Sequence, residues 1–138
     1  DFAVMVLDID HFKAINDTHG HAVGDDVLVK VADRLRNNLR AIDMIARIGG
    51  EEFLIAMPDT TKSEARDAAK RLCALIQSNP FQSTTNGKAI PVTLSIGVAL
   101  GHGERLTDNG TNEIMGRADA ALFDAKTSGR NTIAMSPA

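Results

Sequence analysis

The stretch Arg47-Ile48-Gly49-Gly50-Glu51-Glu52-Phe53 is the part of the chain around which the rest is organised. Apolar residues precede it at 44–46 and follow it at 53–57, so we expect two antiparallel strands joined by a tight turn. Adjacent glycines are typical of such turns because glycine adopts positive φ angles without strain. Glu51 and Glu52 would repel each other at this turn, which favours a metal ion or a basic side chain nearby. A solvated acidic turn is the alternative interpretation.

The composition indicates one globular domain with a hydrophobic core. Of the 138 residues, 43% are hydrophobic, and the net charge of −3 provides no basic surface for nucleic acid or a membrane. The single cysteine, Cys73, excludes a disulfide framework and favours a cytoplasmic location. Because Cys73 falls within an expected helix, we expect it to be a small buried apolar residue. No apolar stretch is long enough to span a membrane. The chain starts without Met directly before an apolar run, so we expect a piece of a longer protein.

Continuous apolar residues at 2–7 predict a strand buried on both faces, and this strand ends in Asp8-Ile9-Asp10. A strand that ends in carboxylates brings them to the sheet edge, where a site can form. Alternatively, one of them, Asp10, caps the helix expected at 11–20. The remaining expected elements are helices at 24–39, 61–79 (opened by a capping box at Thr61) and 112–127, a hairpin around Asn86-Gly87, strands at 92–100 and 131–135, and a loop at 101–110.

This order of elements predicts an α+β fold. Without its additions it is βαββαβ, a ferredoxin-like core with helices on one face, and an extra helix and a short hairpin complete a mainly antiparallel sheet surrounded by helices. In the usual strand order of that fold the first strand lies beside the hairpin strand. Asp8 is therefore expected close to Glu51 and Glu52, and three carboxylates from two segments form a better metal site than the turn alone.

Four motifs together resemble the GGDEF domain of bacterial diguanylate cyclases, which condense two GTP molecules into cyclic di-GMP. Residues 8–17, DIDHFKAIND, are similar to the family's DxDxFKxxND, and residues 20–25, GHAVGD, to its GHxxGD. Residues 47–53 match the signature loop, and residues 118–131 resemble the ADxALYxAKxxGRN ending. The resemblance covers nearly the whole chain, so residues 1–138 are expected to be one GGDEF domain without its N-terminal DxLTGLxNR segment.

The resemblance implies a metal site in the acidic cluster. Asp8, the backbone carbonyl of Ile9 and Glu51 would hold two Mg²⁺ ions on the GTP triphosphate, with Mn²⁺ as a possible substitute, and Glu52 would complete the cluster. In such sites one ion activates the 3′-hydroxyl and the other offsets charge on the departing pyrophosphate. Glu51, Glu52 and Lys13 are the expected catalytic residues.

The resemblance also implies a GTP site. Asn16 and Asp25 would bind guanine, because guanine offers adjacent N–H donors that a carboxylate accepts, and an amide adds a donor and an acceptor. Basic side chains would contact the phosphates. The complete expected set is Lys13, Asn16, His21, Asp25, Gly49, Gly50, Lys126 and Arg130.

Arg40-x-x-Asp43 resembles the family's inhibitory site, where arginine binds the guanine edge or phosphate of the product, and Arg71 could be a second contributor. The alternative is an ordinary ion pair at a helix end. The chain also departs from the family pattern. Glu51 replaces Asp in the signature, and Ile48 and Phe123 replace frequent tyrosines, which we interpret as packing changes.

The resemblance implies a diguanylate cyclase that acts as a homodimer, because each half-site binds one GTP and two half-sites must face each other. An upstream regulatory domain is expected in the full protein, and neither nucleic acid nor a membrane is expected as a partner. One alternative is a non-catalytic receptor for cyclic di-GMP or GTP, but such a receptor would need neither Asp8 nor Lys13. Another is a purine nucleotide cyclase or polymerase palm, against which Asp25 and the GGEEF turn favour GTP.

Overall fold

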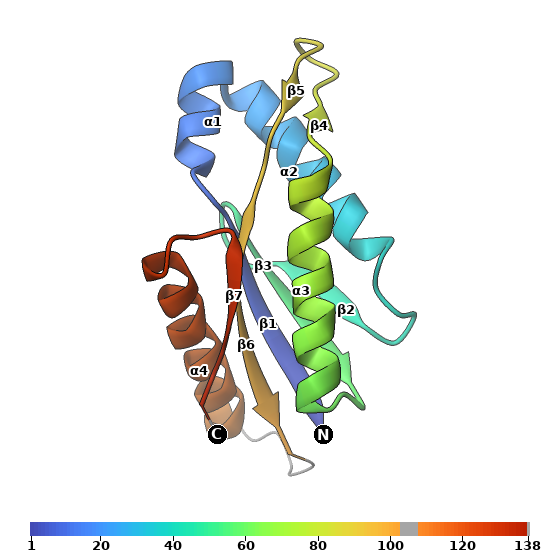
Figure 1. The fold of residues 1–138 in the computed structure, drawn as a ribbon, viewed down its shortest axis with the longest axis vertical. Coiled ribbons are helices and arrows are strands. Elements are labelled where there is room, and N and C mark those ends of the chain that lie inside the picture. The colour runs from blue at the N-terminus through green and yellow to red at the C-terminus, as the bar shows by residue number, and fades with distance from the viewer. Residues whose placement is uncertain (103–107, 138) are drawn as a thin grey trace.

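The structure, a computed structural model, describes residues 1–102 and 108–137 and has the expected α+β architecture (Figure 1). The strands are β1 Phe2–Ile9, β2 Met44–Arg47, β3 Glu52–Pro58, β4 Phe81–Gln82, β5 Ala89–Ile90, β6 Leu94–Gly101 and β7 Thr132–Met135. The helices are α1 Phe12–His19, α2 His21–Arg36, α3 Lys62–Ser78 and α4 Asp108–Thr127.

The main sheet has the strand order β2-β3-β1-β6-β7 and is antiparallel except for the parallel pair β6–β7. The ferredoxin-like βαββαβ core consists, in chain order, of β1, α2, β2, β3, α3 and β6. Helix α1, the β4–β5 hairpin and the α4–β7 unit are additions to that core. The expected fold class is therefore confirmed.

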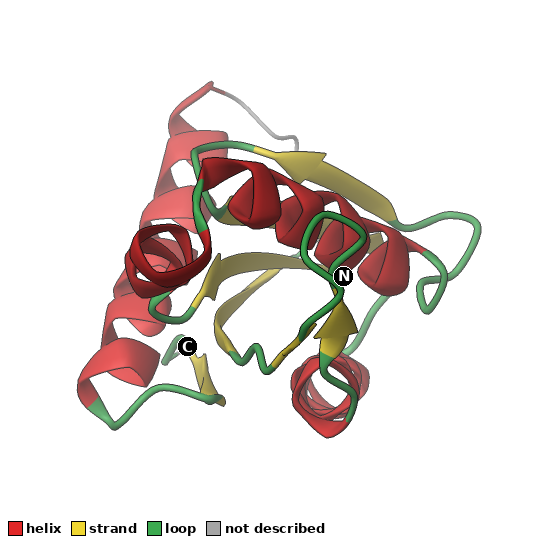
Figure 2. Cartoon of the chain, turned by 90° about the horizontal axis from the view of Figure 1, so that it is seen from above, coloured by secondary structure: helices red, strands yellow, loops and turns green. Residues whose placement is uncertain are grey.

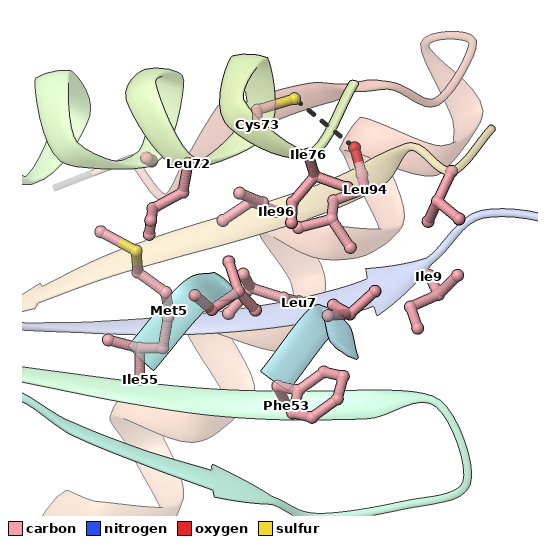
Figure 3. Packing of buried hydrophobic residues seen from close by; sticks show 14 of the residues in the cluster. Met5, Leu7, Ile9, Phe53, Ile55, Leu72, Cys73, Ile76, Leu94 and Ile96 are labelled. Carbon is pink, nitrogen blue, oxygen red and sulfur yellow. Dashed lines mark hydrogen bonds between the residues drawn. The ribbon is translucent and has the colours of Figure 1, made fainter. Parts of the chain in front are cut away.

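Helices lie on both faces of the sheet (Figures 1 and 2). Side chains alternate along β1, so that Met5 and Leu7 enter the core formed with α2 and α3, whereas Val4 and Val6 pack against α4. Figure 3 shows the first of these cores, in which Phe53 and other large side chains are fully buried. The prediction that β1 is buried on both faces is confirmed.

Helix α4 approaches the sheet so closely that only glycine fits beneath it. A Cβ atom at Gly97 of β6 would lie 2.2 Å from the Ala118 carbonyl oxygen and 2.2 Å from the Leu122 nitrogen. Both atoms belong to backbone, which cannot move aside as a flexible side chain can. Gly97 thus fixes the distance between α4 and β6, and with it the position of Lys126 near the end of the helix.

Several element boundaries differ from the prediction. Helix α2 begins at His21 and ends at Arg36, about three residues earlier at each end than expected. Helix α4 begins at Asp108, so part of the loop expected at 101–110 is helical, and residues 103–107 of that loop lie outside the described residues. The capping box is confirmed, because Thr61 accepts from the Glu64 amide and Glu64 from the Thr61 amide. None of the described helices combines the length and apolar composition needed to cross a membrane.

Cys73 is a buried core residue, as expected. Its Sγ lies 3.6 Å from the Leu94 carbonyl oxygen, between α3 and β6 (Figure 3). Burial, and then the charge of Asp10, raise the pKa of the thiol. A thiol with a raised pKa is a weak nucleophile, so Cys73 has a packing role.

Candidate active site

Strand pairing brings Asp8 and Glu52 together. Asp8 lies near the end of β1 opposite Glu52 of β3 on one side and Ser95 of β6 on the other. The Ile9 amide donates to the Glu51 carbonyl oxygen at 3.2 Å, which joins the signature turn to the end of β1. The prediction that β1 brings Asp8 beside the signature turn is thus confirmed, and we call these residues, Asp8, Glu51 and Glu52, the acidic corner.

The Asp8 carboxylate is buried and only partly paired. Its Oδ2 accepts a hydrogen bond from the Lys126 ammonium group, which α4 carries to this edge of the sheet. Its Oδ1 is buried and has no hydrogen-bond partner in the described part of the chain. An unpaired buried carboxylate oxygen is costly, so this atom is available for a cationic or hydrogen-bonding ligand.

Negative charge at the acidic corner exceeds what Lys126 offsets. Burial raises the pKa of Glu52, and the neighbouring charge of Asp8 raises it further, while Lys126 acts in the opposite direction. Asp119 of α4 and Glu51 also raise this pKa. A divalent cation would relieve this repulsion, so the charge at the acidic corner favours the metal ion that the resemblance implies.

Within residues 1–102 and 108–137, no three His, Cys, Asp or Glu side chains are grouped in a geometry that could hold a metal ion. Asp8 pairs with Lys126, whereas Glu51 lines a pocket that does not include Asp8. The assignment of Asp8, the Ile9 carbonyl and Glu51 as metal ligands therefore remains a prediction.

The connection between β2 and β3 carries Glu51, whereas Glu52 is the first residue of β3. Residues 48–51 join β2 to β3, and the Ile48 amide donates to the Glu52 carbonyl oxygen at 3.0 Å. Gly49 and Gly50 are not among the residues with positive φ, so the expectation of a tight turn with positive φ at these glycines is wrong. Arg47 braces the connection instead, because its Nε donates to the carbonyl oxygens of both glycines at 3.1 Å.

A cavity of about 520 Å³ opens between this turn and the α1–α2 corner. It brings together six of the residues predicted to bind or act on GTP, although they come from three separate segments. These are Lys13, Asn16, His21, Asp25, Gly50 and Glu51. The cavity is also lined by Phe12, Asp17, Leu28 and Arg47. We call it the nucleotide pocket, after the ligand that the resemblance implies for these residues.

Asn16 lines the nucleotide pocket and carries an acceptor atom that is not used within the described residues. Its Oδ1 is buried without a hydrogen-bond partner among the described residues. A Cβ atom at Gly24 would lie 1.7 Å from this oxygen, so the glycine leaves room for the Asn16 side chain against α2. Asp25, next to Gly24, lies inside α2 rather than at its start, which excludes a capping role for its carboxylate.

Asp10 is not the helix cap that the sequence suggests. His11, with φ of 55°, precedes α1 and forms no side-chain cap. The buried Asp10 carboxylate instead accepts from Thr93 Oγ1 at 2.7 Å, from Ser95 Oγ at 2.6 Å and from the Asn131 amide at 2.9 Å. It joins β1 to β6 and to the chain that leaves α4.

The other residues assigned from the resemblance lie outside the nucleotide pocket. Lys126 contacts Asp8, as described above. Arg130 follows α4 with φ of 64°, and its amide donates to the Ala125 carbonyl oxygen at 3.1 Å in the capping turn that Gly129 begins. Gly49 and Glu52 flank the pocket without lining it. A phosphate role for Lys126 and Arg130 remains a prediction.

The Arg40–Asp43 pair is built into the fold. The Arg40 guanidinium donates to Asp43 Oδ1 from Nε at 3.1 Å and from Nη2 at 2.8 Å, which raises the pKa of Arg40. The same Nη2 donates to the Pro58 carbonyl oxygen and to Thr60 Oγ1. Arg71 of α3 donates to the Asn38 carbonyl oxygen at 3.1 Å and so braces the same connection. Since α2 ends at Arg36, this is an ion pair in a loop and not at a helix end.

Two residues interpreted as packing changes are exposed, and one candidate for the site was not predicted. Ile48 and Phe123 are 44% and 65% exposed, so a packing explanation for these positions is wrong. Arg47 lines the nucleotide pocket and donates to the carbonyl oxygens of both glycines, a role that the motif alone did not predict. Its place two residues before Gly49 was the available signal.

Comparison with known proteins identifies the family. The family model described as "Diguanylate cyclase, GGDEF domain" matches residues 1–132. The chain belongs to the GGDEF domain family. It is 43% identical over 131 residues to the response regulator PleD of Caulobacter vibrioides, covering 95% of this chain but 28% of PleD. The chain thus spans less than a third of that relative.

Solved structures show the same fold. The GGDEF domain of YfiN (TpbB) from Pseudomonas aeruginosa is 34% identical, with a TM-score of 0.89 over 99% of this chain and 83% of that one. The GGDEF domain of DgcB from Caulobacter crescentus, determined in complex with c-di-GMP, is 33% identical, with a TM-score of 0.87 over 98% of this chain and 77% of that one. These likenesses agree with the ferredoxin-like core described above.

Proposed function

We propose that this GGDEF domain is the catalytic domain of a diguanylate cyclase that condenses two GTP molecules into cyclic di-GMP and two pyrophosphates. The observation that carries the proposal is the nucleotide pocket, which brings Glu51 of the signature turn together with Asn16 and Asp25. The family model and relatives that are named diguanylate cyclases support the same enzyme class. A cytoplasmic location suits the unpaired Cys73, and we expect an upstream regulatory domain in the full protein.

The α1–α2 corner would bind the guanine base. The Asp25 carboxylate can accept from two adjacent N–H groups of guanine, and the unpaired Oδ1 of Asn16 supplies a further acceptor. Adenine lacks this pair of donors, so its binding would leave the acceptors unsatisfied. Lys13, His21 and the glycine turn would then lie along the sugar and phosphates.

The acidic corner would hold two divalent cations, with Mg²⁺ as the expected ion and Mn²⁺ as a substitute. Asp8, the Ile9 carbonyl and Glu51 would bind them, and the charge that raises the pKa of Glu52 is the physical reason that they fit. When bound, such ions activate a hydroxyl nucleophile and stabilise charge on a pyrophosphate leaving group. Lys126 holds Asp8 in position and would offer its ammonium group to a phosphate.

The reaction requires two GTP-loaded domains that face each other, so we propose a homodimer as the active form. An untethered pair meets only by diffusion, whereas a fused dimerising segment raises the effective concentration to about the millimolar range. Turnover by the 138-residue chain should therefore be slow and should rise more than linearly with protein concentration. Full specific activity that does not depend on concentration would contradict the dimer requirement.

Cyclic di-GMP would inhibit the enzyme at Arg40, Asp43 and Arg71. Arg40 and Asp43 lie in the loop between α2 and β2, away from the nucleotide pocket, and Arg71 reaches that loop from α3. A guanidinium group can bind a guanine edge or a phosphate through paired hydrogen bonds. The product would have to compete with the hydrogen bonds that Arg40 already makes with Asp43 and Thr60.

One experiment decides between an enzyme and a receptor. The chain is incubated with GTP and Mg²⁺ at high protein concentration, and the products are separated by mass. Cyclic di-GMP and pyrophosphate support the proposal, and their absence together with tight binding of cyclic di-GMP supports a receptor.

Asp25→Ala should weaken GTP binding by about tenfold or more and ATP binding far less, because guanine donors lose their acceptor. Equal losses would show that Asp25 does not select the base.

A further inference from the structure

Helix α2 carries a second row of polar side chains that play no part in the nucleotide pocket. Asp26, Lys30 and Arg34 are spaced four residues apart and therefore share one side of the helix. Each of them contacts the segment that contains the β4–β5 hairpin. That segment lies more than forty residues further along the chain, and Figure 1 shows it beside α1 and α2, at the end of the molecule away from both termini.

The first two contacts hold the hairpin itself. Asp26 Oδ2 accepts from the Thr84 amide at 3.0 Å and from Thr84 Oγ1 at 3.2 Å. Lys30 pairs with Asp26 at 3.2 Å and donates to the Gln82 carbonyl oxygen. The Thr84 hydrogen bonds lower the pKa of Asp26, so its carboxylate stays charged under ordinary conditions.

The third contact holds the approach to the hairpin. Arg34 Nη1 donates to the Asn79 carbonyl oxygen at 2.6 Å, directly after α3. The Arg34 guanidinium also lies over the Phe81 ring, 3.7 Å from its centroid. At the tip of the hairpin, Asn86 Nδ2 lies 3.4 Å from His19 Nδ1 at the end of α1. The hairpin therefore touches both helices of the α1–α2 corner.

The opposite side of α2 forms the nucleotide pocket. His21, Asp25 and the buried Leu28 line the pocket, whereas Asp26 and Lys30 do not. Neighbouring residues thus have different partners, since Asp25 faces the pocket and Asp26 faces the hairpin. A rotation or shift of α2 would move both sides together.

We propose that the β4–β5 hairpin is a brace that holds the α1–α2 corner, with Asp26, Lys30 and Arg34 as positioning residues for the nucleotide pocket. The inference rests on the proposed function in taking guanine nucleotide as the occupant of that pocket. The corner needs such a brace because Gly20, with φ of 90°, is the one residue between α1 and α2. The hairpin has strands of two residues each, and the buried side chains of Phe81 and Ile90 anchor it in the hydrophobic core.

The test compares two carboxylates of the same helix. Asp26→Ala removes the contact with Thr84, whereas Asp33→Ala removes an exposed carboxylate that pairs with Arg36 at 3.1 Å and makes no hydrogen bond to the hairpin within the described residues. Affinity for a non-hydrolysable GTP analogue is measured by calorimetry on the 138-residue chain. We expect Asp26→Ala to weaken binding about fivefold and Asp33→Ala to leave it within about twofold. Asp26→Glu, which keeps the carboxylate, should restore most of the affinity.

Hydrogen exchange separates the brace from the proposed function. In the absence of ligand, amides of residues 24–28 should exchange faster in Asp26→Ala than in Asp33→Ala, because the corner opens more often. Equal affinity and equal exchange in the two variants would overturn the brace. If the unaltered chain fails to bind the analogue, the proposed function fails, and the exchange comparison alone supports or overturns the brace.

Discussion

The acidic corner and the Arg40 loop each place a carboxylate beside a basic side chain, but they differ in how fully the carboxylate is paired. The Asp43 side chain is 0% exposed and accepts from Arg40 Nε, from Arg40 Nη2 and from the Arg40 amide. Asp8 is also buried, yet Lys126 reaches one of its oxygens and the other has no partner in the described part of the chain. One region is complete without a ligand and the other is not.

This difference distinguishes a structural ion pair from a binding site. A buried polar atom without a partner costs free energy, so an unpaired carboxylate oxygen favours a binding role. A complete pair stabilises the loop that contains it, and a ligand there must displace existing hydrogen bonds. We therefore expect changes in the acidic corner to affect function first, and changes in fully paired carboxylates to affect stability first.

The largest expected effect is that of Asp8→Asn, which keeps the shape of the side chain and removes its charge. The corner must hold two dications in the proposed reaction, so turnover of GTP should fall at least about 100-fold. Product formation in Mg²⁺ measures the loss, and circular dichroism with urea unfolding shows whether the fold survives. Near-normal turnover by this variant would contradict the two-metal assignment.

Asp10→Asn makes the matched change two residues away. We expect it to destabilise the fold more than Asp8→Asn does. The Asp10 carboxylate accepts from three donors, whereas an asparagine must turn its own donor toward one of them. The free energy of unfolding should fall by about 2 kcal/mol, as for a buried hydrogen bond to a charged group. Urea unfolding of the two variants side by side measures this. A larger loss of stability for Asp8→Asn than for Asp10→Asn would reverse the comparison.

Arg40→Ala tests the complete pair. The affinity for cyclic di-GMP should fall about tenfold, the size of one lost charge-assisted hydrogen-bonding group, while the initial rate of product formation stays the same. Arg36→Ala is the control, because Arg36 pairs with an exposed carboxylate on the preceding helix. Loss of the initial rate with unchanged inhibition would show that Arg40 serves the fold alone.

The sequence predicts best what depends on local pattern and strand order. The apolar run at 2–7 identifies a strand buried on both faces, and the ferredoxin-like order then places Asp8 beside the signature turn, as the pairing with Glu52 confirms. The capping box at Thr61 is likewise a short-range signal with a local partner. In each case the physical cause lies within a few residues or in the known geometry of the fold.

The errors arise where the partner of a residue is distant in the chain. Asp10 resembles a helix cap, but its donors Thr93, Ser95 and Asn131 lie more than eighty residues away. Gly24 resembles a helix start, although its small size instead leaves room for Asn16. Such contacts exist only after folding, so local pattern cannot reveal them.

The smallest expected effect is that of Glu52→Gln, and it depends on pH. Burial and the charge of Asp8 raise the pKa of Glu52 in the folded chain above its ordinary value of 4.5, so the folded chain binds this proton more tightly than the unfolded chain does. The free energy of unfolding therefore falls as pH rises from below 4.5 through the folded pKa. Glu52→Gln removes the penalty and should stabilise the metal-free chain at pH 7 by less than about 1 kcal/mol.

Urea unfolding at pH 4 and pH 7 in the presence of a chelator measures this effect, with Glu113→Gln as an exposed control on α4. The gain from Glu52→Gln should be present at pH 7 and should shrink at pH 4, where both states bind the proton more fully. Added Mg²⁺ should stabilise the unaltered chain more than the variant, because the ion would offset the same charge. A variant that is less stable at pH 7 without Mg²⁺ would show that the acidic corner is already balanced by Lys126, and the contrast with the Arg40 loop would then be lost.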